Sequence, residues 1–400
     1  MADQPKRSPR PLHPDTLAIR TQTARSDERE HSTPLFLTSS FVFDDAEQAR
    51  ALFADEISGN IYSRYSNPNT DEFVRKMAQL EGAEEGIAFA SGMAAVFGSM
   101  AAFLKSGDHV VASRALFGST HQLFTKLFPR WGITATYVDA NAPADVWAAA
   151  VQPSTKIVFV ETPSNPGLSL IDLEMLGHLC ADRQLMLIVD NCFTTPILQQ
   201  PIRYGAHLIV HSATKWIDGQ GRTLGGVVVG SAEHMAELRF FIRHTGPAMS
   251  PFNAWILSKS LETLSVRMER HCANALAVAT HFEQHDALDF VRYPYLASHP
   301  DHALAVKQMS AGGGIVILEL KGGLDRARRF LDALELLSHT PNLGDVRTIV
   351  THPTSTTHSK LSEAERLQVG IVPGMIRISV GLEHRDDIIA DIEQALERSA

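Results

Sequence analysis

The chain of 400 residues is long enough for a large domain and a smaller second one, because single hydrophobic cores stop growing at about 250 to 300 residues. Hydrophobic residues make up 44% and charged residues 20%, and no apolar run approaches the roughly 20 residues that span a bilayer. The formal net charge of -9 argues against a general nucleic-acid binder, so we expect a soluble protein that acts on a small molecule, with neither membrane nor nucleic acid as partner.

The N-terminal 60 residues differ in pattern from the rest of the chain. Residues 1–14 are polar, contain proline and lack the apolar stretch of a secretory signal, so we expect a mobile arm there. Residues 15–60 show no alternation of strand-like and helix-like segments. We predict that residues 1–60 form an arm that contacts another subunit.

Between about residues 87 and 230, short apolar runs alternate with segments of helix length. The runs are residues 87–90, 110–112, 134–138, 156–160, 185–189, 208–210 and 227–229. This alternation is typical of βαβ units, in which a mostly parallel sheet is covered by helices on both faces. We predict an α/β fold with a mainly parallel central sheet, in a large domain of residues 61–258.

The C-terminal part predicts a second, smaller sheet. Residues 250–283 have the pattern of one long helix, and the domain boundary falls inside it. Apolar runs at residues 312–320, 346–351 and 375–380 follow, with helical segments between them. We predict a smaller C-terminal α/β domain of residues 259–400.

Lys215 and Asp190 form the most informative pair in the chain. Lys215 closely follows the apolar run 208–210 and lies 25 positions beyond Asp190, which ends the run before it. A lysine amine near a strand end can form a Schiff base with pyridoxal phosphate (PLP), and a neighbouring carboxylate can keep the pyridine nitrogen protonated. Alone, the lysine is most simply a surface residue and Asp190 a helix cap or half of an ion pair. Together they predict a PLP site with Lys215 and Asp190 as catalytic residues.

Two segments offer donors for one phosphate group. Ser91, Gly92 and Met93 follow an apolar run and open a helical segment, where free N–H groups bind anions, although Ser-Gly is also an ordinary cap and turn. Ser212 and Thr214 flank Lys215 with hydroxyl groups.

Three further segments contain polar side chains suited to a PLP site. Arg64, beside Tyr62, can bind phosphate in bidentate fashion or lie in an exposed loop. Asn165, between two prolines, can bind the phenolic oxygen of PLP or serve a rigid turn. Arg377, in an apolar strand, can bind a substrate α-carboxylate or face water.

Metal and dinucleotide sites lack support in the sequence. The 18 histidines include no HExxH motif and no matched Cys/His spacing, so we predict no metal and interpret His211, His352 and His358 as local hydrogen-bonding residues. The three cysteines, Cys180, Cys192 and Cys272, form no CxxC pair or disulfide framework, which fits a reducing cytoplasm. No GxGxxG follows the first strand, which disfavours a nicotinamide dehydrogenase.

Taken together, these motifs resemble the Cys/Met metabolism family of PLP-dependent enzymes, from about residue 16 to residue 396. The resemblance rests on residues 62–64, 91–93, 161–166, 190–191 and 211–215. The runs 116–120, 218–222 and 342–345 are most similar to the O-succinylhomoserine sulfhydrylase branch.

The resemblance implies PLP fold type I, the aspartate aminotransferase-like fold, in a homotetramer built as a dimer of dimers. Tyr62 and Arg64 would then serve the phosphate in the neighbouring subunit, while Gly92, Met93, Ser212 and Thr214 would bind it within the same subunit. Phe117 stands where most members have a ring-stacking tyrosine, so stacking is kept but the phenol is lost. Proton transfer would then fall to Lys215. Cys192, where many members have threonine, has no evident histidine partner, and we do not predict a nucleophile there.

The implied reaction is the replacement of succinate in O-succinyl-L-homoserine by sulfide, which yields homocysteine for methionine biosynthesis. Arg377 and Asn342 would contact the amino-acid part, and either Arg114 or Arg222 would bind the distal succinyl carboxylate. Cystathionine γ-synthase and a γ-lyase are the enzyme alternatives. A cofactor-free binding module on the same scaffold is the non-enzyme alternative, and the presence of Lys215 and Asp190 argues against it.

Overall fold

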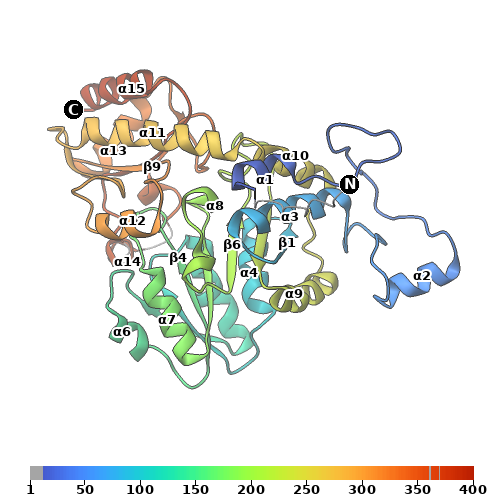
Figure 1. Ribbon diagram of the computed structural model, residues 1–400. Coiled ribbons are helices and arrows are strands. Elements are labelled where there is room, and N and C mark those ends of the chain that lie inside the picture. Colours follow the sequence, from blue (N-terminus) through green and yellow to red (C-terminus); the bar gives the residue numbers. More distant parts are fainter. Residues whose placement is uncertain (1–11, 360–361, 369) are drawn as a thin grey trace, which may run out of the picture.

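The computed structural model describes residues 12–359, 362–368 and 370–400, so residues 1–11 of the predicted arm lie outside the described residues. Two β-sheets with helices packed on them make up the body of the molecule, and a long N-terminal segment extends from it (Figure 1). The larger sheet has seven strands in the order β1-β7-β6-β5-β4-β2-β3. These strands are β1 (Glu85–Phe89), β2 (His109–Ser113), β3 (Thr134–Val138), β4 (Thr155–Glu161), β5 (Met186–Asp190), β6 (Leu208–Ser212) and β7 (Gly226–Gly230).

The pairing of these strands confirms the predicted mainly parallel sheet. β7 runs antiparallel to both of its neighbours, β1 and β6, whereas the pairs β6-β5, β5-β4, β4-β2 and β2-β3 are parallel. Each of the seven predicted apolar runs overlaps one strand. Because β1, β4, β5 and β6 point the same way, their carboxyl ends meet at one edge of the sheet.

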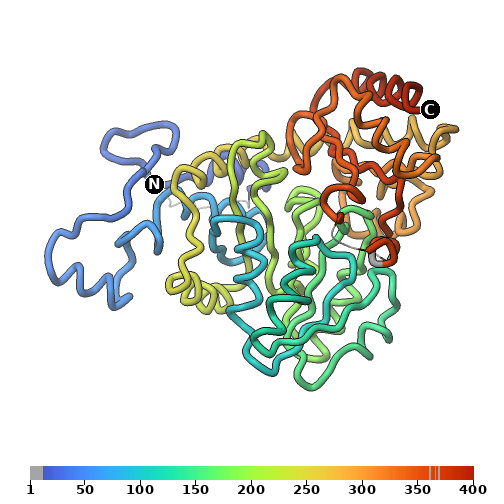
Figure 2. Tube along the Cα trace, turned by 180° about the vertical axis from the view of Figure 1, so that it is seen from behind, coloured from blue at the N-terminus to red at the C-terminus, as the bar shows by residue number. Residues whose placement is uncertain are grey.

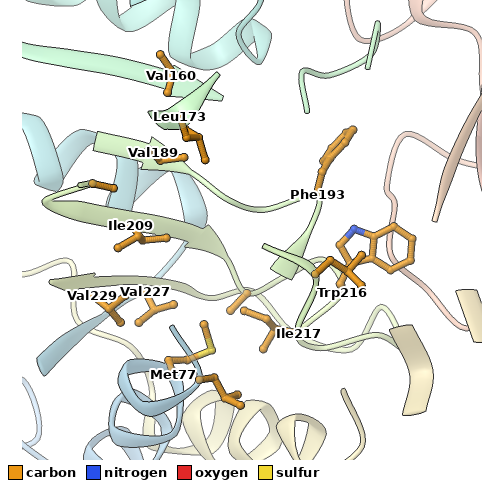
Figure 3. Packing of buried hydrophobic residues seen from close by; sticks show 14 of the residues in the cluster. Met77, Val160, Leu173, Val189, Phe193, Ile209, Trp216, Ile217, Val227 and Val229 are labelled. Atoms are coloured by element: carbon orange, nitrogen blue, oxygen red, sulfur yellow. The ribbon is translucent and has the colours of Figure 1, made fainter. Parts of the chain in front are cut away.

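Helices cover both faces of the larger sheet. Successive side chains of its strands point to opposite faces, and the side chains on both faces are buried. Val158 and Val160 of β4 face one core, and Ile157 and Phe159 face the other. The first face is covered by α3 (Pro68–Glu81), α7 (Leu173–Arg183) and α10 (Pro251–Leu261), and Figure 3 shows Val160, Val189, Ile209 and Val227 of this face with Met77 of α3. The second is covered by α4 (Gly92–Ala101), α9 (Ala232–Thr245), η1 (Leu123–Leu127) and η2 (Phe128–Trp131). Short elements complete the connections: α5 (Gly118–Gln122), α6 (Ala144–Ala149), α8 (Thr195–Leu198) and η3 (Pro201–Tyr204).

The smaller sheet has five strands in the order β10-β11-β12-β9-β8 and lies in the C-terminal part, as predicted. Its strands are β8 (Leu288–Arg292), β9 (Ile315–Leu320), β10 (Ser338–His339), β11 (Ile349–Thr351) and β12 (Met375–Ser379). Strands β8 and β10 have no counterpart among the predicted runs. The remaining elements are α11 (Leu264–Phe282), α12 (His302–Gln308), α13 (Gly323–Ala333), η4 (Pro353–Ser355), α14 (Glu363–Gln368) and α15 (Arg385–Arg398).

The two faces of the smaller sheet have different partners. Ile376 and Ile378 of β12 pack with side chains of α11, α13 and α15 in a separate core. Met375 of β12 and Ile317 of β9 instead join the core of the larger sheet. Arg377 alternates with Ile376 and Ile378, so it lies on the face directed at the larger sheet. This arrangement places a charged side chain between the two sheets.

The prediction of one helix over residues 250–283 is wrong. Helix α10 ends at Leu261 and α11 begins at Leu264, with a turn between them. The carbonyl of Ser260 accepts the N–H of Thr263 at 3.2 Å and the guanidinium of Arg267 at 3.0 Å, instead of continuing the helical ladder. Arg267 also donates to the carbonyls of Trp216 at 2.6 Å and Ile217 at 3.1 Å, so tertiary contacts hold the chain at this turn. The proposed domain boundary, between residues 258 and 259, lies in α10.

The N-terminal segment contains two helices, α1 (Pro14–Arg20) and α2 (Ala46–Phe53). Ala18 of α1 is buried against the main core, whereas the chain around α2 extends away from the body in Figures 1 and 2. Glu72 of α3 anchors this segment by accepting the N–H of Thr23 at 2.8 Å. Val42 and Leu37 of this segment are 98% and 70% exposed in the single chain, and the subunit contact stays a prediction. Among the described residues, no helix is long and apolar enough to cross a membrane.

We predict that Gly177→Ala destabilises the fold. A Cβ atom on this residue of α7 would lie 1.9 Å from the carbonyl oxygen of Tyr204, so α7 and η3 would have to separate. The free energy of unfolding, measured by urea denaturation, should fall by about 1 to 3 kcal/mol. Gly118→Ala in α5 is the control, because its nearest neighbour would lie 3.6 Å away. Equal stability of the two variants would contradict the prediction.

Candidate active site

The loops that follow β1, β4, β5 and β6 meet at one edge of the larger sheet, where most of the predicted site residues lie. Lys215 follows β6, Asp190 ends β5, Asn165 follows β4, and Ser91 and Gly92 follow β1. Asn342, in the loop between β10 and β11, and Arg377, in β12, approach the same edge from the smaller sheet, as the following contacts show.

Lys215 is held in a tight turn after β6 with its amine directed at the smaller sheet. Its backbone N–H donates to the carbonyl of Ser212 at 3.2 Å, and its carbonyl accepts the N–H of Gly219 at 2.9 Å. The Nζ atom donates to Oδ1 of Asn342 at 2.7 Å. Burial lowers the pKa of the Lys215 ammonium, and the charge of Arg377 lowers it further. The lower pKa increases the fraction of neutral, nucleophilic amine near neutral pH.

Asp190 and Glu161 place two carboxyl groups side by side at the edge. The two residues are paired in the register of the parallel strands β5 and β4. Asp190 Oδ1 accepts the N–H of Cys192 at 3.0 Å, and burial raises the pKa of Asp190 to about 6 despite this bond and the nearby His211. Burial and the negative charge of Asp190 raise the pKa of Glu161 as well. Such a pair favours a cationic ligand, because a positive charge would offset both effects.

The N-terminus of α4 lies against Ser212 and has the features of an anion site. The hydroxyl of Ser91 caps the helix by accepting the N–H of Ala94 at 3.2 Å, so the N–H groups of Gly92 and Met93 precede the helical hydrogen bonds. A Cβ on Gly92 would lie 2.5 Å from the side chain of Ser212, so only glycine allows this close approach.

The predicted hydroxyl donors differ in their contacts. Thr214 Oγ1 already exchanges hydrogen bonds with the backbone of Gly225, accepting its N–H at 3.1 Å and donating to its carbonyl at 3.3 Å. Ser212 is therefore the better placed hydroxyl of the two predicted donors.

Arg377 is fully enclosed and binds neutral acceptors. It is 1% exposed, which rules out the alternative that it faces water. Nη1 donates to Oδ1 of Asn165 at 2.9 Å, and Nη2 donates to the carbonyls of Asn342 at 2.9 Å and Pro341 at 3.4 Å. Its Nε is a buried nitrogen without a hydrogen-bond partner among the described residues. A guanidinium with these contacts suits a carboxylate ligand, whose charge would offset the cost of burial.

Phe117 and Asn165 both donate backbone hydrogen bonds to the carboxyl group of Glu161. Phe117 precedes α5 and donates its N–H to Oε2 of Glu161 at 2.8 Å, while Asn165 donates its N–H to Oε1 at 3.0 Å. The side-chain oxygen of Asn165 binds Arg377, a contact that the sequence did not predict. The sequence predicted that Glu161 lies at the edge of the sheet, but it predicted no role for this residue. Glu161 and Asp190 each end an apolar run of the sequence, and this shared position is the signal that would have identified Glu161.

The structure does not bring Tyr62 and Arg64 into contact with the Lys215 network of the same chain. The guanidinium of Arg64 lies 5.5 Å from the ring centre of Tyr62 and 4.8 Å from that of Tyr65, and it donates to the carbonyl of Arg243 in α9. These contacts hold the pair at the base of the N-terminal segment.

Arg114 and Arg222 each bind a carboxylate of their own chain. Arg114 Nε donates to Oδ1 of Asp139 at 2.7 Å beyond β3, and Arg222 Nε donates to Oδ1 of Asp218 at 3.1 Å. Arg222 also contacts Ser260 of α10. The choice between them as a ligand for a second carboxylate therefore stays open.

Other polar residues near the site have structural contacts. His211, His352 and His358 hydrogen-bond to Glu81, Ser355 and Thr357. Burial raises the pKa of the Cys192 thiol, which keeps the thiol protonated and unreactive. Among the described residues, no three His, Cys, Asp or Glu side chains are arranged to hold a metal ion.

A family model described as Cys/Met metabolism PLP-dependent enzyme matches residues 15–397. The chain belongs to this family. The O-succinylhomoserine sulfhydrylase of Pseudomonas aeruginosa is 48% identical over 382 residues, which cover 96% of this chain and 94% of that protein. The L-methionine gamma-lyase of Fusobacterium nucleatum subsp. polymorphum is 40% identical over 386 residues, with coverage of 96% and 98%.

A solved structure confirms the fold type I prediction and the cofactor. A Campylobacter jejuni protein named as an O-acetylhomoserine (thiol)-lyase superposes with a TM-score of 0.93 at 34% identity, covering 96% of this chain and all of that chain. That structure contains N'-pyridoxyl-lysine-5'-monophosphate, a lysine joined to PLP. The protein is thus a PLP-dependent enzyme of the family, and its site fits the cofactor: an amine at Lys215, carboxyl groups that favour a cation, and a helix N-terminus whose Gly92 leaves room for an anion.

We predict that Asp190→Asn stabilises the cofactor-free protein at high pH. A pKa of about 6, above the ordinary value near 3.8, means that ionisation of Asp190 costs folding free energy as the pH rises from about 4 to 6. The variant should therefore be more stable than the wild type by about 1 to 3 kcal/mol at pH 8, and the gain should vanish below pH 4. Urea denaturation across this pH range measures both values.

Asp218→Asn is the control for this prediction. Asp218 is buried, but Arg222 binds its carboxylate at 3.0 Å, so its removal should destabilise the protein at pH 8. A stabilisation of both variants, or of neither, would contradict the assigned cause.

Proposed function

We propose that the protein replaces the succinyl group of O-succinyl-L-homoserine by sulfide, yielding L-homocysteine and succinate as an O-succinylhomoserine sulfhydrylase of methionine biosynthesis. The observation that carries the substrate class is the Lys215 amine 2.7 Å from Asn342, whose backbone carbonyl binds Arg377 at 2.9 Å. One network thus joins the amine that would hold an aldehyde cofactor to a carboxylate-binding group, and an α-amino acid needs both. The acyl group and the sulfur donor are inferred from the Pseudomonas relative.

Bound PLP would supply an electron sink that stabilises negative charge on substrate carbon atoms. In our proposal Lys215 Nζ holds the cofactor and, once free, moves protons at the α- and β-carbons, with Asn342 Oδ1 orienting the amine. Its lowered pKa suits this role, since a neutral amine accepts a proton. Asp190 keeps the pyridine nitrogen charged, and Arg377 binds the α-carboxylate.

The remaining contacts are assigned on the same basis. Gly92 and Met93 donate N–H groups to the phosphate, with Ser91, Ser212 and Thr214 around them, and Phe117 packs on the ring. Tyr62 and Arg64 reach the phosphate of a neighbouring subunit within a homotetramer, in agreement with their separation from Lys215 in one chain. Asn165 orients Arg377 and borders the ring. Phe117 has no phenol, so proton transfer depends on Lys215.

A γ-lyase is the second candidate, favoured by the 40% identity to a methionine gamma-lyase. A lyase would release ammonia and a keto acid without incorporating sulfide. The loss of the phenol at Phe117 favours replacement, because γ-elimination requires protonation of a poor leaving group, whereas succinate leaves readily as a carboxylate.

Lys215 should be the residue that binds the cofactor covalently. Borohydride reduction followed by peptide mapping should give a pyridoxyl adduct at Lys215, and Lys215→Ala should lose the adduct and turnover by at least about a thousandfold. Lys259→Ala is the matched control and should retain both, because Lys259 is a partly exposed residue of α10 whose amine pairs with Glu262 at 3.0 Å. An adduct elsewhere would contradict the site.

Steady-state turnover of O-succinyl- and O-acetyl-homoserine, each with sulfide and with cysteine, tests the reaction. We expect the succinyl ester with sulfide to have the highest kcat/KM, by at least about tenfold, because a charged acyl group offers a second recognition point. A higher value with cysteine would indicate cystathionine γ-synthase. Rapid cleavage of methionine without a sulfur donor would indicate a lyase.

A further inference from the structure

Glu161 is a buried carboxylate whose two oxygens are both used by the site. It ends β4, is 5% exposed, and accepts the Phe117 N–H at Oε2 and the Asn165 N–H at Oε1, at 2.8 and 3.0 Å. These two donors lie in different loops, one after β2 and one after β4. A single carboxyl group therefore sets the distance between them.

The hydrogen bonds continue from Glu161 to the reactive amine. Asn165 Oδ1 accepts Arg377 Nη1 at 2.9 Å, and Arg377 Nη2 donates to the carbonyl of Asn342 at 2.9 Å. Asn342 Oδ1 then accepts Lys215 Nζ at 2.7 Å. An unbroken series of hydrogen bonds links Glu161 to both Arg377 and Lys215.

A purely structural turn would not need a charge at this position. Burial beside Asp190, the residue paired with it in β5, makes an ionised Glu161 costly and raises its pKa. Two N–H donors on opposite oxygens oppose this effect, because an ionised carboxylate accepts at both atoms. A neutral amide of the same size would meet only one of the two donors.

We propose that Glu161 is a positioning residue that fixes Phe117 and Asn165 relative to Lys215 and, through Asn165, sets the direction of the Arg377 guanidinium. The inference rests on the proposed function in one respect, the binding of an amino-acid carboxylate by Arg377. It does not depend on the acyl group or on the sulfur donor.

Two substitutions alter the contacts of Glu161 in different ways. Glu161→Gln keeps the size but turns an NH2 group toward one of the two N–H donors. Glu161→Asp keeps both oxygens but withdraws them by one methylene. Both should let Phe117 and Asn165 move, with a smaller effect for aspartate.

The test uses holoenzyme and L-norleucine, an amino acid without a γ-leaving group. We expect Glu161→Gln to raise the dissociation constant of norleucine, read from cofactor absorbance, about tenfold, and Glu161→Asp about threefold. The visible circular dichroism band of bound PLP should weaken in both, since Phe117 contributes to the asymmetric surroundings of the ring. In an Arg377→Lys background, Glu161→Gln should add less than about twofold, because the effect passes through Arg377.

Glu319→Gln is the matched control. Glu319 is a buried strand carboxyl of the smaller sheet, 7% exposed, and it accepts one backbone N–H, that of Gly374 at 3.1 Å. This variant should leave the norleucine affinity and the dichroism band unchanged.

Unchanged norleucine binding and dichroism in the Glu161 variants would overturn the proposal, as would a full tenfold effect in the Arg377→Lys background. If Glu161→Gln does not fold, Glu161→Asp decides. Failure to form homocysteine would contradict the proposed reaction and leave this test intact.

Discussion

The buried guanidinium of Arg377 is the contact on which the site depends. It lies on the face of the smaller sheet that joins the main core, and it binds Asn165 from the larger sheet and Asn342 from the loop above Lys215. Burying a guanidinium against neutral carbonyls alone is costly, and burial lowers its pKa to about 10. The fold bears this cost at a position where a carboxylate ligand would reduce it.

The parallel strands explain why the remaining groups meet Arg377. Glu161 and Asp190 end neighbouring strands in register, so their carboxyl groups are brought together by backbone pairing alone. Lys215 follows the next strand, and the N-terminus of α4 reaches it because Gly92 has no side chain. The edge thus combines two carboxyl groups with the N-terminus of a helix, which the proposed function assigns to a ring nitrogen and a phosphate.

The chain is similar both to a sulfhydrylase and to a gamma-lyase, and the hydrogen-bond network of the site is compatible with either kind of enzyme. In the proposed function, the network from Glu161 to Lys215 would bind the amino and carboxylate groups, which are common to all α-amino acids. The leaving group and the sulfur donor would be recognised outside it. Arg114 and Arg222, the two cations considered for that purpose, are each bound to an aspartate of this chain, so ligand recognition there would compete with an existing ion pair.

Much of this protein was determined by the sequence itself. Apolar runs with helix-length spacing predicted all seven strands of the larger sheet, because the periodicity of apolar residues is a local property of the sequence. Lys215, Asp190 and Gly92 were identified from their positions next to those runs. The break between α10 and α11 and the burial of Arg377 were decided only by tertiary structure, since both involve partners distant in sequence. At the break, for example, the guanidinium of Arg267 donates to the carbonyls of Trp216 and Ile217. The same holds for Asn165, which binds Arg377 across 212 positions, and for Arg64, whose guanidinium donates to the carbonyl of Arg243 in α9 and not to the Lys215 network.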